Sequence, residues 1–203
     1  MARSHETSAQ PGRPRDKTLD ETLIRVTLEV LSETGLESVT MAKIGRRSGI
    51  PATSIYRRYP DARSLILAAI KADLDETQFD LEDQGSLRAD LLALLRVIAK
   101  ALSPQRSRML AGLLLPTQSD ATLEAMFKTK LDAFRSEGWR GAVRRAVQRG
   151  TLRPEAQEAQ PLDDVAHTMI FFQSVVKREP ADDVFLGRLL DNVLMPALEP
   201  YRT

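Results

Sequence analysis

The chain has 203 residues, of which 42% are hydrophobic, a formal net charge of +1 and no cysteine. This length and apolar content allow a sizeable core in one large or two small domains, and the lack of cysteine excludes disulfides, thiolate metal sites and cysteine nucleophiles. We expect a cytoplasmic protein without a membrane anchor, because the polar N-terminus lacks a signal peptide's apolar segment and the stretch 91–102 is interrupted by Arg96 and Lys100.

Residues 1–15 are rich in Ser, Pro, Gly, Gln and Arg and have almost no apolar side chains, so we expect a disordered basic arm. Within it, Gly12-Arg13-Pro14, followed by Arg15, is similar to the core of an AT-hook, whose extended backbone enters a narrow minor groove. Arg13 and Arg15 are therefore predicted to contact DNA. A tripeptide also occurs without that role, so an arm that makes no minor-groove contact is the alternative.

Apolar residues spaced by three and four predict a first helix from Asp16 to the stop at Gly35. Further helical patterns cover 41–47, 51–59 and 61–79, and a Ser48-Gly49 break separates the second from the third. Thr40 and Asp61 are typical N-caps, and Pro51 suits the first turn of a helix. Two short helices joined by a tight turn are typical of a helix-turn-helix.

The charges in this region favour DNA as the partner. Between Glu37 and Asp61 lie 23 residues without a carboxylate, and they include Lys43, Arg46, Arg47, Arg57 and Arg58. A helix-turn-helix lays one helix across the phosphate backbone and the next in the major groove, where positive charge is favourable. For Arg46 and Arg47, which end the second helix, a favourable interaction with the helix dipole is an equally good explanation.

The remainder of the chain also reads as helical, with no strand-like alternation of useful length. The expected segments are 86–102, 106–115, 120–149, 162–177 and 181–198, separated by Pro104, Pro116, Pro154, Pro161 and Pro180. A polar segment around Gly85 divides them from the helix-turn-helix unit. We therefore predict an all-α fold.

The stretch from Val39 to Pro60, with its Thr40 cap, Ser48-Gly49 turn and Ile55-Tyr56-Arg57-Arg58-Tyr59-Pro60 ending, resembles the DNA-binding domain of TetR-family bacterial regulators. The segment Arg145-Ala146-Val147-Gln148-Arg149-Gly150-Thr151-Leu152-Arg153 is similar to one found in a subgroup of TetR-type C-terminal domains. This resemblance implies a helix-turn-helix domain at 16–78, a larger helical ligand-binding and dimerisation domain at 86–203, and a homodimer.

The resemblance also implies roles for single residues. Thr40 and Tyr56 fall on phosphate contacts, and the predicted groove-facing residues are Ala52, Thr53, Ser54 and Arg57. Arg57 could donate to a guanine or, with Arg58, only to phosphate or water, and Tyr56 could be an ordinary core aromatic. The chain departs from the family pattern at Pro51, commonly serine, and at Ala62, commonly a lysine that contacts phosphate. That phosphate contact is therefore either missing or supplied by Arg63 or Arg58.

The segment 162–177 has apolar side chains on two faces, which indicates two packing partners. One is its own subunit's core, and the other is best explained by a symmetric mate, although a fully buried central helix would give the same pattern. The predicted dimer interface is Val165, Met169, Phe172 and Val176, with Phe185, Leu189 and Val193 of the last helix.

A small, largely apolar ligand is the implied effector, and no cofactor is expected. Large apolar residues on the helices that surround the family's pocket are the candidate lining, although each is a candidate for ordinary core packing too: Leu94, Ile98, Met109, Leu113, Met126, Phe127, Phe134 and Trp139.

The predicted function is a DNA-binding transcriptional regulator, in the first place a repressor that a small molecule releases from a palindromic double-stranded DNA operator. Activation and ligand-independent regulation are alternatives. An all-helical enzyme is a remote one, because only His5 and His167 exist, and Asp164 with His167 lacks the second pair that a bundle metal site needs. A protein-binding adaptor would leave the acid-free window unexplained.

Overall fold

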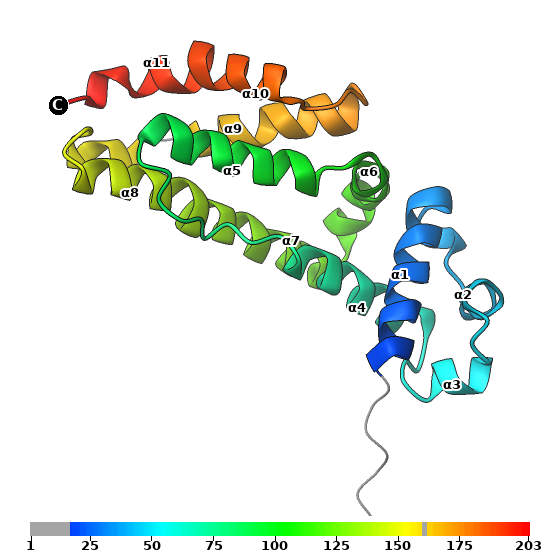
Figure 1. Cartoon of the computed structure of the whole chain (residues 1–203). Helices are drawn as coiled ribbons and strands as arrows, with labels where there is room; N and C mark the ends of the chain where they lie inside the picture. The colour runs from blue at the N-terminus through cyan, green and yellow to red at the C-terminus, as the bar shows by residue number, and fades with distance from the viewer. Residues whose placement is uncertain (1–16, 160–161) are drawn as a thin grey trace, which may run out of the picture.

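The computed structural model describes residues 17–159 and 162–203, apart from the side chains of residues 114 and 115. Within those ranges the chain is helical, with one isolated bridge between Leu152 and Arg202 and no strand, which confirms the all-α prediction. Arg13, Arg15 and Pro161 lie outside the described residues. A small unit, α1 to α3, sits at one end of a longer helical bundle, and α4 runs between them (Figure 1).

The helices have the following bounds: α1 Lys17–Thr34, α2 Met41–Ser48, α3 Ala52–Tyr56, α4 Ala62–Asp75, α5 Leu87–Ala101, α6 Pro104–Ser119, α7 Ala121–Ala133, α8 Arg140–Gln148, α9 Leu162–Phe171, α10 Asp183–Leu189 and α11 Met195–Leu198. Three π-helical segments continue α7, α9 and α10, at Phe134–Trp139, Phe172–Val176 and Leu190–Leu194. Short 3₁₀ turns occupy Leu36–Ser38, Pro154–Glu158 and Glu199–Tyr201.

Local signals set the helix boundaries of the small unit. Thr40 Oγ1 accepts the Lys43 N–H at 3.2 Å, and Asp61 forms a capping box with Ser64 at the start of α4. Gly49 ends α2 with φ of 70°, the left-handed conformation that glycine adopts without penalty. The third helix is shorter than expected, because it loses regular hydrogen bonding after Tyr56 while residues 57–59 complete a turn.

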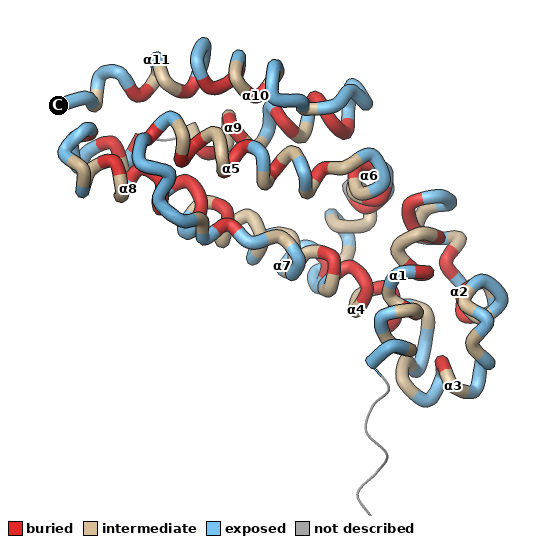
Figure 2. The backbone as a smooth tube through the Cα atoms, in the orientation of Figure 1, coloured by how far each residue is buried: buried red, intermediate tan, exposed pale blue. Residues whose placement is uncertain are grey.

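The core of the small unit is shared with the bundle. Leu23, Val30, Ile44, Ile55 and Leu65 are fully buried at its centre. The same apolar cluster includes three residues of α6 and α7, namely Met109, Leu113 and Leu123, and α6 packs directly on α1. The helix-turn-helix is therefore attached to the bundle by packing as well as by α4 (Figure 2).

Prolines and long periodic patterns caused the differences from the predicted segments. Pro116 was expected to end a short helix, but α6 runs from Pro104 to Ser119 with Pro116 inside its last turn. Pro116 has no N–H to donate, so α6 lacks one backbone hydrogen bond there. The loss falls in the last turn, where only three residues of the helix follow, and the helix tolerates it. The predicted helix 120–149 is interrupted by a π-helical turn at Phe134–Trp139, which apolar periodicity does not signal.

A buried ion-pair cluster ties α5 to α8. Asp90, with 0% of its side chain exposed, lies 2.7 Å from Arg149 Nη2 and 3.4 Å from Arg145 Nη2, and its Oδ1 accepts the Gln84 N–H. Arg145 lies in α8 and Arg149 follows four residues later at its C-cap, so both reach the same carboxylate. This gives a physical reason for the Arg-Ala-x-x-Arg-Gly segment: its arginines neutralise a carboxylate inside the bundle.

Candidate nucleic-acid interface and ligand cavity

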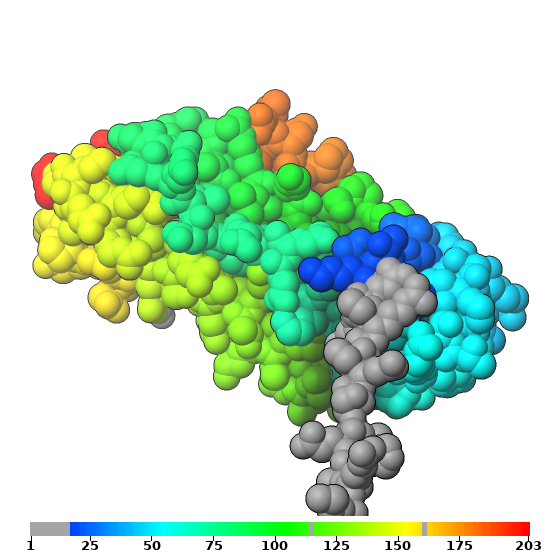
Figure 3. All heavy atoms as spheres, turned by 60° about the horizontal axis from the view of Figure 1, so that its bottom comes forward, coloured from blue at the N-terminus to red at the C-terminus, as the bar shows by residue number. Residues whose placement is uncertain are grey.

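The α2–turn–α3 region presents an exposed face. Ala52, Thr53, Tyr56 and Arg57 are exposed on it and Ser54 is half-buried, while Ile55, on the opposite side of α3, is fully buried. Tyr56 has 54% of its surface exposed, so it is not an ordinary core aromatic. Figure 3 shows the small unit, coloured blue to cyan, at one end of an elongated molecule.

Gly45 lets α2 approach α3 closely. A Cβ at this position would lie 3.3 Å from the Ile50 carbonyl oxygen and 3.5 Å from Ile55 Cδ1. The two helices of the motif therefore cross at a point where a larger side chain would force a shift. That packing fixes the direction in which α3 projects from the unit.

Thr40 sits at the edge of this face, at the N-terminus of α2. Its hydroxyl oxygen is already used as an acceptor by the Lys43 N–H. A hydroxyl group accepts and donates at once, so its hydrogen stays available for a phosphate oxygen. The structure thus shows the capping role, and the phosphate contact stays a prediction.

The five cations of the acid-free window have different surroundings. Arg47 Nη2 lies 2.7 Å from Glu33 Oε1, and Arg58 Nε lies 2.8 Å from Asp20 Oδ1. The hydrogen bond from Arg47 lowers the pKa of Glu33 below its ordinary value. Both carboxylates belong to α1, so an absence of acids along the sequence did not mean an absence of acids in space.

Arg58 was predicted to contact DNA, and in the structure it braces the end of α3 against α1. Only 10% of its side chain is exposed, so it would have to leave Asp20 to reach a phosphate. Lys43 donates to Thr34 Oγ1 at 3.0 Å. Within the described part of the chain, Lys43, Arg46 and Arg57 take part in no ion pair; Arg46 and Arg57 are exposed and Lys43 is half-buried. These three are the cations of the window that are available to DNA.

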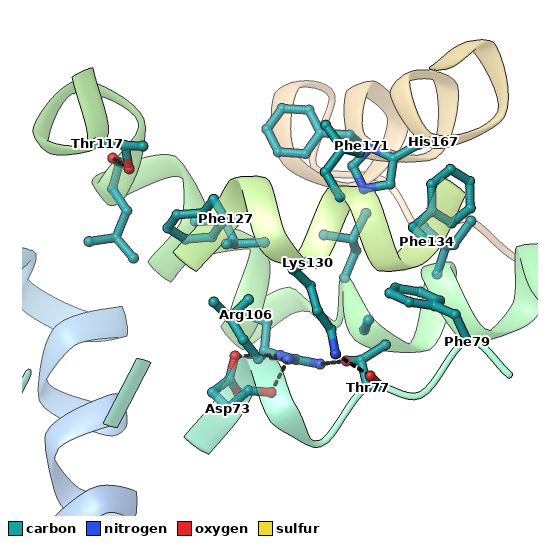
Figure 4. A pocket seen from close by; sticks show the side chains of 17 residues that line it. Asp73, Thr77, Phe79, Arg106, Thr117, Phe127, Lys130, Phe134, His167 and Phe171 are labelled. Atoms are coloured by element: carbon teal, nitrogen blue, oxygen red, sulfur yellow. Dashed lines mark hydrogen bonds and ion pairs between the residues drawn. The ribbon is translucent and has the colours of Figure 1, made fainter. Parts of the chain in front are cut away.

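A cavity of about 290 Å³ lies in the bundle beside the end of α4 (Figure 4). Its walls come from α4, α5, α6, α7 and α9, and four phenylalanines line it: Phe79, Phe127, Phe134 and Phe171. The rings of Phe79 and Phe134 meet edge to face at 5.6 Å between centroids, and Phe134 is 5.4 Å from the His167 ring. The size and lining suit a small apolar molecule.

The structure brings half of the predicted pocket residues to this cavity. Ile98, Leu113, Phe127 and Phe134 line it. Leu94 and Trp139 are instead buried in the bundle core, while Met109 and Met126 pack with the core of the small unit. A helix of the bundle has several buried sides, and apolar periodicity does not say which of them meets a void.

Sequence reasoning missed the polar part of the cavity. Asp73, Thr77, Arg106 and Lys130 lie on one wall, and His167 lies away from them among the aromatic rings (Figure 4). Burial lowers the pKa of His167 below its ordinary value, so the ring is favoured in its neutral form. No role in a pocket was predicted for His167 from the sequence. The one signal for such a role was a lone histidine within an otherwise largely apolar helix.

Comparisons with known proteins decide the family. The sequence model described as "Bacterial regulatory proteins, tetR family" matches residues 23–69, and that described as "Tetracyclin repressor-like, C-terminal domain" matches residues 81–193. The chain belongs to the TetR family. Because the family consists of DNA-binding transcriptional regulators, the enzyme and adaptor alternatives are set aside.

Relatives cover nearly the whole chain. A Mycobacteroides abscessus protein named "DNA-binding transcriptional repressor TetR" is 31% identical over 189 residues, 92% of this chain and 97% of that protein. A Saccharomonospora viridis transcriptional regulator, solved in complex with choline, has a TM-score of 0.71 at 14% identity and covers 88% of this chain and 96% of its own. A Rhodococcus regulator has a TM-score of 0.69 at 15% identity, covering 91% and 98%. These two structures share the fold.

The TetR helix-turn-helix of this chain departs from the family pattern at two positions whose surroundings are now visible. Pro51 stands at the N-cap of α3 and makes no side-chain capping bond. Arg63, one of two arginines that could replace the missing lysine at Ala62, lies 2.8 Å from Asp120 of the bundle. Like Arg58, it is engaged within the protein in this structure.

An apolar patch on α9 and the last helices is the remaining feature of this TetR chain. Met169, Phe172, Val176 and Val193 are 41%, 46%, 56% and 41% exposed. Val165 and Phe185 are half-buried against the bundle core. Leu189, predicted for the same interface, is 4% exposed and belongs to its own subunit's core. It follows Phe185 by four residues in α10, so both lie on the bundle-facing side, and the π-helical segment that comes next turns Val193 away from that side.

No helix within the described residues combines the length and the apolarity needed to cross a bilayer.

Proposed function

We propose that this regulator is a homodimeric repressor that binds a palindromic operator and leaves it when a small, largely apolar molecule fills the cavity. Residues 16–78 serve as the DNA-binding domain and residues 86–203 as the ligand-binding and dimerisation domain. The observation that carries this proposal is the place of the cavity. Its wall includes Asp73, Leu74 and Thr77, at the end of the helix whose other end adjoins α3.

The position of α4 supplies the switch. A ligand in the cavity changes the packing around the end of α4, and α4 in turn packs along α1 of the DNA-reading unit. The ligand must bind the DNA-incompetent arrangement more tightly in order to shift the population. Two reading units bind one face of DNA only when their spacing fits consecutive major grooves, roughly 34–36 Å apart.

The exposed patch of Met169, Phe172, Val176 and Val193 supports the homodimer. Four large apolar side chains on adjoining helices are unfavourable in water, and a two-fold axis through the patch would bury both copies. Repression, rather than activation, is supported by the Mycobacteroides abscessus relative, which is named a repressor.

Selection of DNA sequences by the purified protein tests the proposal. We expect enrichment of one palindromic sequence, followed by release of that DNA by some members of a small-molecule library. Failure to enrich any sequence would overturn sequence-specific binding. Enrichment without any releasing compound would favour a ligand-independent regulator, and tighter binding with a compound would favour an activator or a corepressor response.

Two variants of the DNA face separate base reading from phosphate contact. Arg57→Ala should weaken operator binding and relax one base position, since an arginine–guanine contact contributes about 1–3 kcal/mol of discrimination. Tyr56→Phe should weaken binding to operator and random DNA alike. It removes only the hydroxyl expected to contact a phosphate, and phosphates are the same in every sequence. Equal losses on both DNAs for Arg57→Ala would contradict its base-reading role.

A further inference from the structure

The polar side chains of the cavity hold the end of α4. Arg106 of α6 donates from Nε to the Asp73 carboxylate at 2.9 Å, from Nη2 to the Asp73 carbonyl oxygen at 2.6 Å and from Nη1 to Thr77 Oγ1 at 3.2 Å. Lys130 of α7 donates to the Thr77 carbonyl oxygen. Figure 4 shows both cations directed at this segment from the cavity wall. The last turn of α4 and the residues after it are thus fixed to α6 and α7 by two bundle cations.

These bonds satisfy groups that the end of a helix leaves without partners. The Asp73 carbonyl oxygen is one of the last four of α4, for which the helix itself supplies no regular N–H donor. A cation at this end of a helix also interacts favourably with the helix dipole. The Arg106–Asp73 pair is largely shielded from water, because the Arg106 side chain is 19% exposed and the Asp73 side chain 9%. Whatever removes Arg106 therefore weakens the attachment of α4.

The charges that line the cavity do not balance. Its charged lining residues are Asp73, Arg106 and Lys130, two positive and one negative. Asp75 and Glu137 also influence Lys130, but both are exposed outside the cavity lining, and Asp75 pairs with Lys71 at 2.5 Å. Partial burial is the first cause that lowers the pKa of Lys130, and the nearby Arg106 lowers it as well. A further negative charge would be stabilised at this wall.

A cationic ligand is disfavoured by the same arrangement. Lys130 Nζ lies 5.2 Å from the centroid of the Phe79 ring, where an ammonium is attracted by the ring face. The protein's own cation thus occupies a position that a quaternary ammonium would otherwise use. Away from the charged wall the lining is mainly phenylalanine and aliphatic side chains, with His167 among them. The ligand therefore needs an apolar body and one anionic end.

We propose that the effector is a monoanion, a carboxylate on a small apolar body, whose head group takes Arg106 and Lys130 away from Asp73 and Thr77. This inference rests on the proposed function for its regulatory consequence. A carboxylate can accept two parallel bonds from a guanidinium, so it competes directly with the Asp73 carboxylate. The end of α4 is then free to change its position against α6 and α7, and the DNA-reading unit moves with it.

Three probes with one body and different heads test the ligand class. A cavity of about 290 Å³ holds on the order of ten non-hydrogen atoms, if each takes the ~30 Å³ of a water in the liquid. Octanoate, octanol and octylammonium are therefore suitable, and their binding is measured by titration calorimetry. We expect octanoate to bind at least tenfold more tightly than the other two. Equal or tighter binding of either competitor, or no binding of octanoate, would overturn the proposal.

Variants place the head group. Lys130→Met keeps the apolar stem and should weaken octanoate roughly tenfold, the size of one hydrogen bond to a charged group, while leaving octanol unchanged. Asp73→Asn removes the competing carboxylate and should tighten octanoate. Ala101→Phe, at the cavity lining, should weaken octanoate and octanol alike. Unchanged octanoate binding in both Lys130→Met and Asp73→Asn would show that the head group lies elsewhere.

DNA release separates this inference from the proposed function. The selected operator is titrated with protein in the presence of octanoate, and each variant is checked for native helical content. Head-group preference without DNA release would support the ligand class and contradict ligand-induced release. DNA release by neutral or cationic compounds alone would support release and overturn the carboxylate proposal.

Discussion

Arg63, the second residue of α4, lies 2.8 Å from Asp120, which also accepts the backbone N–H groups of Thr122 and Leu123 at the start of α7. The bond from Arg63 is the main cause that lowers the pKa of Asp120. One carboxylate therefore caps a bundle helix and holds an arginine near the DNA-binding face. With Arg106 near its C-terminus, α4 is attached to the bundle at both ends.

Releasing Arg63 should strengthen binding to DNA. Asp120→Ser keeps an N-cap acceptor for α7 but removes the charge that holds Arg63. Because water screens this exposed pair, we expect affinity for any duplex to rise only roughly threefold at low salt. Fluorescence anisotropy at several salt concentrations measures the effect. In an Arg63→Gln background the same substitution should do nothing; a persisting gain would show that Arg63 does not reach phosphate.

The Asp90 cluster should contribute strongly to stability. Asp90→Ala leaves Arg145 and Arg149 without their buried carboxylate, which we expect to cost about 3–5 kcal/mol in urea unfolding. Asp191→Ala is the matched control, because Asp191 pairs with Arg88 at 2.8 Å while both are about half exposed. Its effect on stability should be far smaller, because water screens an exposed pair. Similar losses for the two variants would contradict a special role for the buried cluster.

Phe172→Glu should convert the proposed dimer into folded monomers. The side chain is 46% exposed in one subunit, so a charge there is tolerated by the isolated fold but not inside a two-fold interface. Sedimentation velocity reports the change in mass, and circular dichroism checks that helix content is kept. Leu189→Glu should instead unfold the bundle, since Leu189 is buried. A dimer that survives Phe172→Glu would show that another face pairs.

His167 should make the fold less stable in mild acid. Burial lowers its pKa in the folded state, with Asp164 acting in the opposite direction, whereas the unfolded chain keeps the ordinary value near 6.5. Around and below that value the unfolded state binds a proton at His167 that the folded state does not bind. The free energy of unfolding therefore decreases as pH falls from about 7.5 toward 5.5. Urea midpoints at both pH values for wild type and His167→Gln measure it. An equal pH dependence in the two proteins would exclude His167 as the cause.

Local sequence signals predicted the helices well where one residue has one physical role. Thr40, Gly49 and Asp61 act through hydrogen bonds or backbone conformation within a few residues of themselves, so they are readable without the fold. Pro116 misled because its effect depends on how many helical bonds remain beyond it. The π-helical segments were missed because apolar periodicity does not distinguish a single π-helical turn from regular α-helix.

The sequence by itself determined the all-helical class, the helix-turn-helix and the two-faced character of residues 162–177, because caps, turns and periodicity are local properties. Only the tertiary structure decided which charges are available and where the cavity lies. Arg47 and Arg58 meet acids of α1 that are 14 or more residues away in the chain, and Arg106 meets Asp73 across 33 residues. Electrostatic pairing and voids depend on distance in space, which spacing along the chain does not encode.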